Sequence, residues 1–264
     1  MDLRAQVVLL TGASRGIGVA IAEELGRQGA HVLLTARSAE GLAKTAALVE
    51  AAGGQARSLA GDISSSAFRE QLVQSAQAWG PIRALVNNAG MEHPDTFLES
   101  DLAQVDLQLA VNLQAPIHLT RLVLPQMVEK GQGAVVMVSS MSGKSPTPYN
   151  AIYTATKHGL NGFAASIRIE LQDSGVHVGV VCPSFVGQAG MWKDTGMRAP
   201  AMMKEVPLSQ VVRGTLRALN GAPEVLVTPT PVRPLLALAQ LFPRLDGWLL
   251  RKMGILKVLE QRAD

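Results

Sequence analysis

Tyr153 and Lys157 stand four residues apart in the stretch AIYTATKHGL, so a helix places the phenol and the ammonium group on one face. In water a phenol titrates near pH 10, and only about one molecule in a thousand is ionised at neutral pH. A neighbouring cation favours the phenolate, and lowering the pKa by about three units requires about 4 kcal/mol. The pair predicts proton transfer by Tyr153, with an amphipathic ring packed on a helix as the structural alternative.

A second candidate site is the glycine-rich stretch TGASRGIG, residues 11–18, which follows the apolar run Val7 to Leu10. The residues after it, Ile17, Ile21 and Leu25, share one helical face. Glycines at a strand-to-helix turn let the backbone approach a phosphate, and the free N–H groups of the helix attract its charge. Such a turn is, by itself, weak evidence of nucleotide binding.

The elements that must position these groups follow from short apolar runs that alternate with longer segments of helical spacing. The runs begin at residues 7, 31, 84, 134 and 176. Strands without polar alternation are typical of a parallel sheet covered on both faces. We therefore expect an α/β fold, a doubly wound Rossmann-type sheet of about seven parallel strands through about residue 228, in one domain spanning residues 1–264.

The glycine spacing Gly-x-x-x-Gly-x-Gly resembles that of the short-chain dehydrogenase/reductase family. The resemblance extends over residues 6 to about 228 and continues, in chain order, through Asn87-Asn88-Ala89-Gly90, Asn112, Ser140 and Tyr153 with Lys157. It implies an enzyme that interconverts a carbonyl and a secondary alcohol by hydride transfer with a nicotinamide cofactor and no metal. A cofactor-binding scaffold without turnover is the alternative from another class.

The resemblance implies one chain of catalytic roles. Tyr153 gives its proton to the carbonyl oxygen during reduction and takes it back during oxidation, helped by Lys157 and the charge of oxidised nicotinamide. Lys157 also holds the nicotinamide ribose. Ser140, thirteen residues before Tyr153, hydrogen-bonds the reacting oxygen and is preferred to Ser139. Asn112 retains a water that extends the proton relay.

The end of the second strand indicates which cofactor is bound. Ala36 stands where family members that prefer NAD carry an acid, and Arg37 follows it. Arg15 and Arg37 can pair with a 2′-phosphate, which predicts NADP(H) rather than NAD(H), with two solvated arginines as the alternative. Asp62 and Ile63 resemble the family's adenine contacts, although Asp62 is also suited to capping the next turn.

Together, the motif and the resemblance predict a set of cofactor contacts. They are Gly12, Ser14, Arg15, Gly16, Ile17, Gly18, Arg37, Asp62, Ile63, Asn88, Ala89, Gly90, Tyr153, Lys157, Pro183 and Val186. After Pro183 the chain departs from the family, because Ser184 and Gln188 replace the usual glycine and threonine. We expect the side-chain amide of Gln188 to substitute for the threonine contact.

Two segments late in the chain are candidates for substrate contact. Residues 187–206 lack a clear hydrophobic period, which predicts a lid over the site. Its methionines either line an apolar substrate pocket or seal the lid against the domain. These residues are Met191, Met197, Met202 and Met203, beside Trp192. In the tail, residues 231–264, a helical stripe is expected over Leu238, Phe242, Leu245, Leu249 and Met253, with Pro234 and Pro243 at helix starts or a break and Gly254 as a cap. This stripe is expected to dock on its own core, on a sister subunit or on a membrane surface.

Composition sets limits on partners and location. Of 264 residues 47% are hydrophobic and 17% charged, and the net charge of +3 is too small for an electrostatic nucleic-acid binder. The lone Cys182 favours a reducing compartment and a core position. Without an apolar span long enough for a bilayer, we expect a cytoplasmic homodimer or homotetramer that acts on a small, apolar substrate.

Overall fold

The computed structural model describes residues 1–197, 199, 204–242, 244–252 and 254–263, except for the side chains of residues 245, 246, 249 and 263. Its centre is a seven-stranded sheet in the order β3-β2-β1-β4-β5-β6-β7, with parallel pairing throughout. The strands are β1 Val7–Thr11, β2 His31–Ala36, β3 Gln55–Ala60, β4 Ile82–Asn87, β5 Gly133–Val138, β6 Val176–Pro183 and β7 Glu224–Val227. The predicted doubly wound sheet is confirmed.

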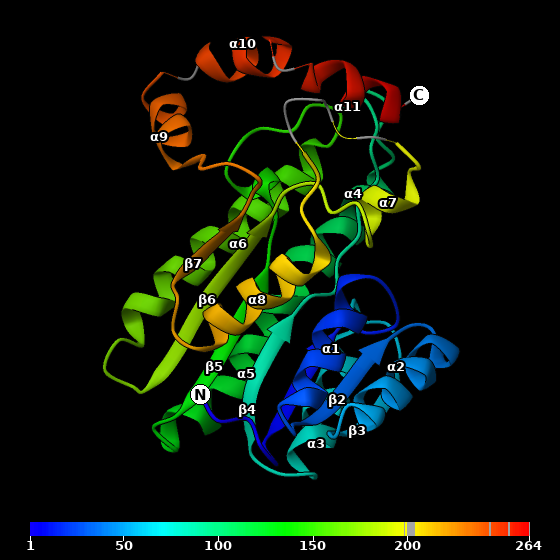
Figure 1. Ribbon diagram of the computed structural model, residues 1–264, viewed down its shortest axis with the longest axis vertical. Helices are drawn as coiled ribbons and strands as arrows, with labels where there is room; N and C mark the ends of the chain where they lie inside the picture. Colours follow the sequence, from blue (N-terminus) through cyan, green and yellow to red (C-terminus); the bar gives the residue numbers. More distant parts are fainter. Residues whose placement is uncertain (198, 200–203, 243, 253, 264) are drawn as a thin grey trace.

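Helices cover both faces of this sheet (Figure 1). One face carries α1 Ile17–Arg27, α2 Ala39–Ala51 and α8 Leu208–Leu219. The other carries α3 Ser66–Gln77, α5 Ala115–Glu129 and α6 Ala151–Glu170. Two shorter helices are α4 Leu102–Leu109 and α7 Met191–Asp194, and two irregular turns are the π-helical η1 Ala110–Gln114 and the 3₁₀ η2 Met141–Gly143.

Strand β1 shows why the sequence forms a two-faced sheet. Val8 and Leu10 pack with one helical layer, whereas Val7 and Leu9 pack with the other. Successive side chains of a strand point to opposite faces, so a strand buried on both sides must be apolar at every position. All five residues of β1 are buried, which places the sheet at the centre of the core.

The order of the strands determines where a ligand can bind. Strand β1 pairs with β2 on one side and with β4 on the other. The strands are thus added outward from β1 in opposite directions, and the strand order reverses between β1 and β4. In open α/β sheets the crevice beyond the carboxyl ends at such a switch point is the usual ligand site. The glycine-rich stretch and the segment after Asn87 both begin there.

The tail forms three helices above the carboxyl ends of the strands, at the opposite end of the molecule from the N-terminus (Figure 1). They are α9 Arg233–Leu241, α10 Arg244–Lys252 and α11 Ile255–Ala263. Within the described residues, none of the helices is both long enough and apolar enough to cross a bilayer.

Candidate active site

The glycine-rich stretch forms a close contact between backbone segments. Gly12 and Gly16 have positive φ values of 67° and 64°, a region that side chains disfavour. A Cβ at Gly12 would lie 2.8 Å from the Cα of Ala89, and one at Gly18 would overlap the carbonyl of Gly12. The three glycines are therefore required by the turn itself.

Asn88 ties this turn to the end of β4. Its Nδ2 donates to the carbonyl oxygens of Thr11 and Gly12 at 3.0 and 3.1 Å, and the hydroxyl of Thr11 accepts from the backbone N–H groups of Asn88 and Ala89. These bonds hold the two segments at the switch point together. Asn88 thus has a structural role at the position where the sequence predicts a cofactor contact.

A cavity of about 600 Å³ extends from this turn to helix α6, which carries Tyr153 and Lys157. Of the predicted cofactor contacts, fourteen line its wall: Gly12, Ser14, Arg15, Gly16, Ile17, Arg37, Asp62, Asn88, Ala89, Gly90, Tyr153, Lys157, Pro183 and Val186. Gly18 and Ile63 are outside the wall. Gly18 packs against Gly12 and Asn88, and Ile63 packs into the hydrophobic layer that contains α3.

The wall near the turn fits a dinucleotide phosphate. Helix α1 begins at Ile17 without a side-chain cap from the described residues and without an acid in its first turn, so its N–H groups face the cavity uncompensated. Arg37 lines the same wall. Arg15 differs from expectation, because its guanidinium forms an exposed ion pair with Asp194 of α7. It connects the turn to the lid segment.

Asp62 has the capping role that was its structural alternative. Its Oδ1 accepts from the backbone N–H of Ser64 at 2.9 Å. This hydrogen bond lowers the pKa of Asp62, burial opposes it, and the charge of Arg37 adds to the lowering. The carboxylate also lines the cavity, so capping leaves it available to a ligand.

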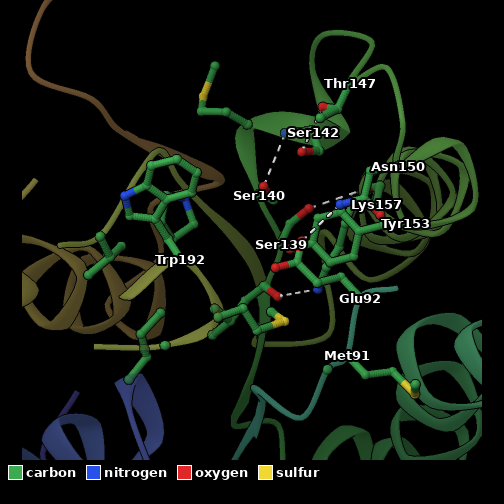
Figure 2. A pocket seen from close by; sticks show the side chains of 18 of the residues that line it. Met91, Glu92, Ser139, Ser140, Ser142, Thr147, Asn150, Tyr153, Lys157 and Trp192 are labelled. Atoms are coloured by element: carbon green, nitrogen blue, oxygen red, sulfur yellow. Dashed lines mark hydrogen bonds between the residues drawn. The ribbon is translucent and has the colours of Figure 1, made fainter. Parts of the chain in front are cut away.

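Tyr153 and Ser140 meet at the other end of the cavity (Figure 2). Tyr153 lies in the first turn of α6, and Ser140 is near enough to its phenol to act on the pKa of that group. The Ser140 Oγ accepts from the backbone N–H of Ser142 at 3.1 Å, which fixes its position at the start of η2. Ser139 is buried, and its Oγ is 3.4 Å from the carbonyl oxygen of Lys157. The geometry agrees with the preference for Ser140.

Lys157 and Asn112 lie behind the phenol. The Nζ of Lys157 donates to the carbonyl oxygen of Val138 at 3.0 Å and is 5.4 Å from the centroid of the Tyr153 ring. Asn112, in the π-helical turn, is fully buried and exchanges two hydrogen bonds with the backbone of Met91, at 2.8 and 2.7 Å. A Cβ at Gly90 would lie 3.7 Å from that Nζ and 3.4 Å from Asn112 Oδ1, so the backbone between them is close to both.

The electrostatics of Tyr153 differ from the expectation. Burial raises the pKa of Tyr153 above its usual value, and the carboxylate of Glu92 raises it further; the hydrogen bond with Ser140 and the charge of Arg262 oppose this, and Cys182 adds a small increase. Burial also lowers the pKa of Lys157 to about 8. The expected lowering of the phenol's pKa by Lys157 is therefore wrong for the chain alone, because desolvation outweighs a partner that is itself desolvated.

The segment after β6 leads into the lid. Pro183 and Val186 line the cavity, and Val186 forms a parallel bridge with Val206 that closes the segment into a loop. Gln188 does not reach the cavity wall, because its Oε1 accepts from the backbone N–H of Leu208 at 3.0 Å and caps α8. The proposed substitute for the threonine contact is thus incorrect.

Trp192 is the anchor of the lid segment. It is buried, packs on Phe185 with ring centroids 4.4 Å apart, and donates from Nε1 to Glu205 at 3.0 Å. Met191 and Trp192 line the cavity, as do Met91 and Met141. Met197 is half-buried outside the cavity wall, and Met202 and Met203 lie outside the described residues.

The tail closes the cavity from above. Its lining residues come from all three tail helices and the turn before them: Val232, Leu235, Leu236, Ala239, Leu250, Ile255, Leu259 and Arg262. The single stripe predicted from the sequence is incorrect. Helix α9 ends at Leu241, a further helix ends before Gly254, and the side chains of Leu238 and Phe242 are exposed. Pro234 does start a helix, and Gly254, with φ 70°, does end one. Pro243 and Met253 lie outside what the structure describes, as do the side chains of Leu245 and Leu249.

Two residues that the sequence did not single out complete the wall beside Tyr153. Glu92 follows the Asn88–Met91 segment, and Arg262 is near the end of α11; the two form an ion pair with side chains 10% and 11% exposed. Asn150, directly before α6, donates to the same carboxylate at 2.8 Å. With 170 positions between Glu92 and Arg262, no local pattern connects them.

Comparison with known proteins agrees with this geometry. A family model described as short chain dehydrogenase matches residues 6–199. Ketoacyl reductase HetN of Nostoc sp. is 38% identical over 99% of this chain and 94% of its own length. A D-beta-hydroxybutyrate dehydrogenase of Cupriavidus necator is 31% identical over 80% of this chain and 81% of its own length.

Solved structures give the same picture. A metagenomic short-chain oxidoreductase in complex with NADP is 36% identical with a TM-score of 0.74, covering 88% of this chain and 100% of that one. A 3-oxoacyl (acyl-carrier-protein) reductase from Agrobacterium tumefaciens with NADP bound is 28% identical with a TM-score of 0.78, covering 87% of this chain and 95% of that one. The matched span, the relatives aligned over most of their length and the shared fold show that this chain belongs to the short-chain dehydrogenase family of nicotinamide-dependent oxidoreductases.

Proposed function

We propose that the protein is an NADP(H)-dependent oxidoreductase that reduces a ketone to a secondary alcohol and catalyses the reverse reaction. The observation that carries this proposal is the single cavity that joins the glycine-rich turn to the side chains of Tyr153, Lys157 and Ser140. A cofactor site and a proton donor within one cavity meet the geometric requirement for this reaction.

Each end of the cavity has a distinct task in the proposed reaction. The N–H groups at the start of α1 hold the pyrophosphate, and Arg37 pairs with a 2′-phosphate that an acid at position 36 would repel. Lys157 orients the nicotinamide ribose. When bound, NADPH supplies a hydride to the carbonyl carbon. Ser140 hydrogen-bonds the carbonyl oxygen, and Tyr153 gives that oxygen its proton.

The buried phenol is suited to the donor role. Because its pKa is raised, Tyr153 holds its proton throughout the neutral range and is ready to donate it as negative charge develops on the substrate oxygen. In the proposed relay, a water held at the backbone of Asn112, beside Lys157, replaces the proton that Tyr153 donates; both side chains lie close to the backbone at Gly90. This arrangement favours ketone reduction, because Tyr153 donates its proton in that direction and does not have to be ionised first.

The roof of the cavity indicates the kind of substrate. The tail contributes leucine, isoleucine and alanine side chains, and the lid contributes Met191 and Trp192. Such a wall binds an alkyl or acyl chain attached to the carbonyl. The similarity to a ketoacyl reductase and to a 3-oxoacyl reductase supports a 3-oxoacyl thioester as the first substrate to test.

The assembly that we propose is a homo-oligomer. Phe97, Leu98 and Leu102 are 68%, 97% and 77% exposed, next to one another before and within α4. Large exposed apolar side chains that lie together mark an association surface.

The proposal is tested by mixing the purified protein with NADPH or NADH and a panel of ketones and 3-oxoacyl thioesters, and by following absorbance of the reduced cofactor. We expect consumption of NADPH with stoichiometric formation of a secondary alcohol, and a kcat/KM at least tenfold higher with NADPH than with NADH. Equal use of the two cofactors would overturn the assignment of Arg37. Tight NADPH binding without turnover of any member of the panel would favour a scaffold.

A further inference from the structure

The Glu92–Arg262 ion pair is a charged feature of the cavity wall to which the proposed reaction gives no task. Both carboxylate oxygens of Glu92 face the guanidinium, with Nη1 of Arg262 3.1 Å from Oε2 and Nη2 against Oε1. Two-point contacts of this kind fix orientation as well as charge. Because only about a tenth of either side chain is exposed, the pair is only weakly screened by water.

The pair joins four parts of the molecule that are distant in the sequence. Glu92 belongs to the loop after β4 and also accepts from Asn150, at the start of the helix that carries Tyr153. Arg262 belongs to α11, and its guanidinium is 5.7 Å from the ring centroid of Trp192 in the lid. A rigid link between these elements sets how the roof sits over the catalytic helix.

Only a few charged or titratable groups act on Tyr153. Glu92 from the loop after β4 and Cys182 from β6 disfavour loss of its proton, whereas Arg262 from α11 favours it. Lys157, on α6 itself, is 5.4 Å from the ring. Ser140 acts on the phenol in the same direction as Arg262. Glu92 and Arg262 line the same cavity as Tyr153, so the ion pair places two opposite charges around its hydroxyl, and neither is part of the family resemblance.

We propose that Glu92 and Arg262 are positioning residues: their ion pair fastens α11 over the active site and balances the electric field at the Tyr153 hydroxyl. This inference rests on the proposed function for the second part, whereas the fastening of α11 stands by itself. The roles are separable, because breaking the pair from either side releases the helix, but the charge left behind has opposite sign in the two cases.

The test compares Glu92→Gln, Arg262→Gln and the double variant in the full chain. A matched control is Lys257→Gln, which removes an exposed cation from the same helix. The first readout is hydrogen exchange over residues 255–262 without substrate. We expect both single variants to exchange at least tenfold faster than the parent there, and the control to be unchanged. Unaltered exchange in both single variants would overturn the fastening role.

The second readout is the pH dependence of alcohol oxidation with NADP⁺, in which Tyr153 must first lose its proton. We expect the acidic limb, where activity falls because Tyr153 is protonated, to shift to lower pH in Glu92→Gln and to higher pH in Arg262→Gln, and to return near the parent's position in the double variant. Shifts in the same direction, or none, would overturn the electrostatic role, because misplacement of α11 alone affects both variants alike.

The two readouts separate failure of this inference from failure of the proposed function. If no alcohol or ketone is turned over by the parent protein, the oxidoreductase proposal fails, and the exchange measurement still decides whether the pair fastens α11. If the parent is active and the pH profiles of the two single variants do not shift in opposite directions, the proposed function stands and the electrostatic role of the ion pair is wrong.

Discussion

At the scale of single residues, burial and charges from distant parts of the chain set how the groups of the site titrate. Tyr153 and Lys157 share a face of α6 by their spacing, whereas Ser140 reaches them from the end of β5 through the packing of the two elements. The groups that change their pKa values, Glu92 and Arg262, come from elsewhere in the chain. Burial, the largest effect, is a property of the folded molecule and has no local signal.

Lys157 provides a pH test of this burial. Its pKa is lowered from 10.5 to about 8 by folding, so between about pH 8 and 10 the unfolded chain binds a proton that the folded chain releases. The contribution of Lys157 to stability therefore rises with pH across this window, by at most about 1.4 kcal/mol per pH unit. We expect the stability of the parent relative to Lys157→Met to increase from pH 7.5 to 9.5 in urea unfolding without nucleotide.

Comparison with Lys157→Met removes contributions that both proteins share, including the raised pKa of Tyr153, which lowers stability only above its usual titration near pH 10. A stability difference that stays constant or declines over the same range would show that the ammonium is not desolvated by folding.

At the scale of elements, strands and glycine turns were predictable, whereas the tail was not. The turn at residues 12–18 needs glycine at fixed points because of positive φ and close backbone contact, so its sequence is nearly determined by its shape. In the tail, Pro234, Pro243 and Gly254 predicted helix starts, a break and a cap, but the helical spacing predicted one stripe and did not show which side chains face the cavity. The breaks let the tail bend over the cavity instead of crossing it as one rod.

The roof has a measurable consequence for substrate size. Leu259 of α11 is 4% exposed and lines the cavity, whereas Leu241 of α9 is 74% exposed and does not. We expect Leu259→Ala to lower the ratio of kcat/KM for 2-decanone to kcat/KM for 2-butanone about tenfold. This change corresponds to about 1.4 kcal/mol of apolar contact with the longer chain. Steady-state kinetics with both ketones measure this ratio.

Leu241→Ala serves as the control, because it removes the same atoms from the outer side of the tail. Equal ratios in the two variants would contradict a substrate-binding role for the inner face of α11.

At the scale of the whole molecule, the doubly wound parallel sheet followed from apolar strands and intervening helices, whereas the order of its strands is known from the structure. The docking of the tail on its own chain was one of three alternatives left open by the sequence. Tail side chains such as Leu235 and Leu259 line the cavity, whereas those of Leu238, Phe242 and Trp248 are exposed on the outer side. Contact of that side with a membrane stays a prediction for vesicle flotation.

Association of copies is testable through the exposed apolar side chains around α4. We expect light scattering after size-exclusion chromatography to give a mass of at least two chains, and Leu98→Glu with Leu102→Glu to shift it toward one chain, because charges on a buried interface are costly. A parent protein that elutes as one chain at all concentrations would contradict the oligomer.

The measurement that tests the central claim most directly is ketone reduction by Tyr153→Phe, with NADPH affinity measured on the same sample by fluorescence. The phenyl ring preserves the packing of α6 and removes only the hydroxyl. If Tyr153 protonates the substrate oxygen, kcat falls about 10²- to 10⁴-fold while the dissociation constant of NADPH changes less than about threefold. Turnover within about twofold of the parent's, with NADPH bound equally well, would show that the proton comes from another group.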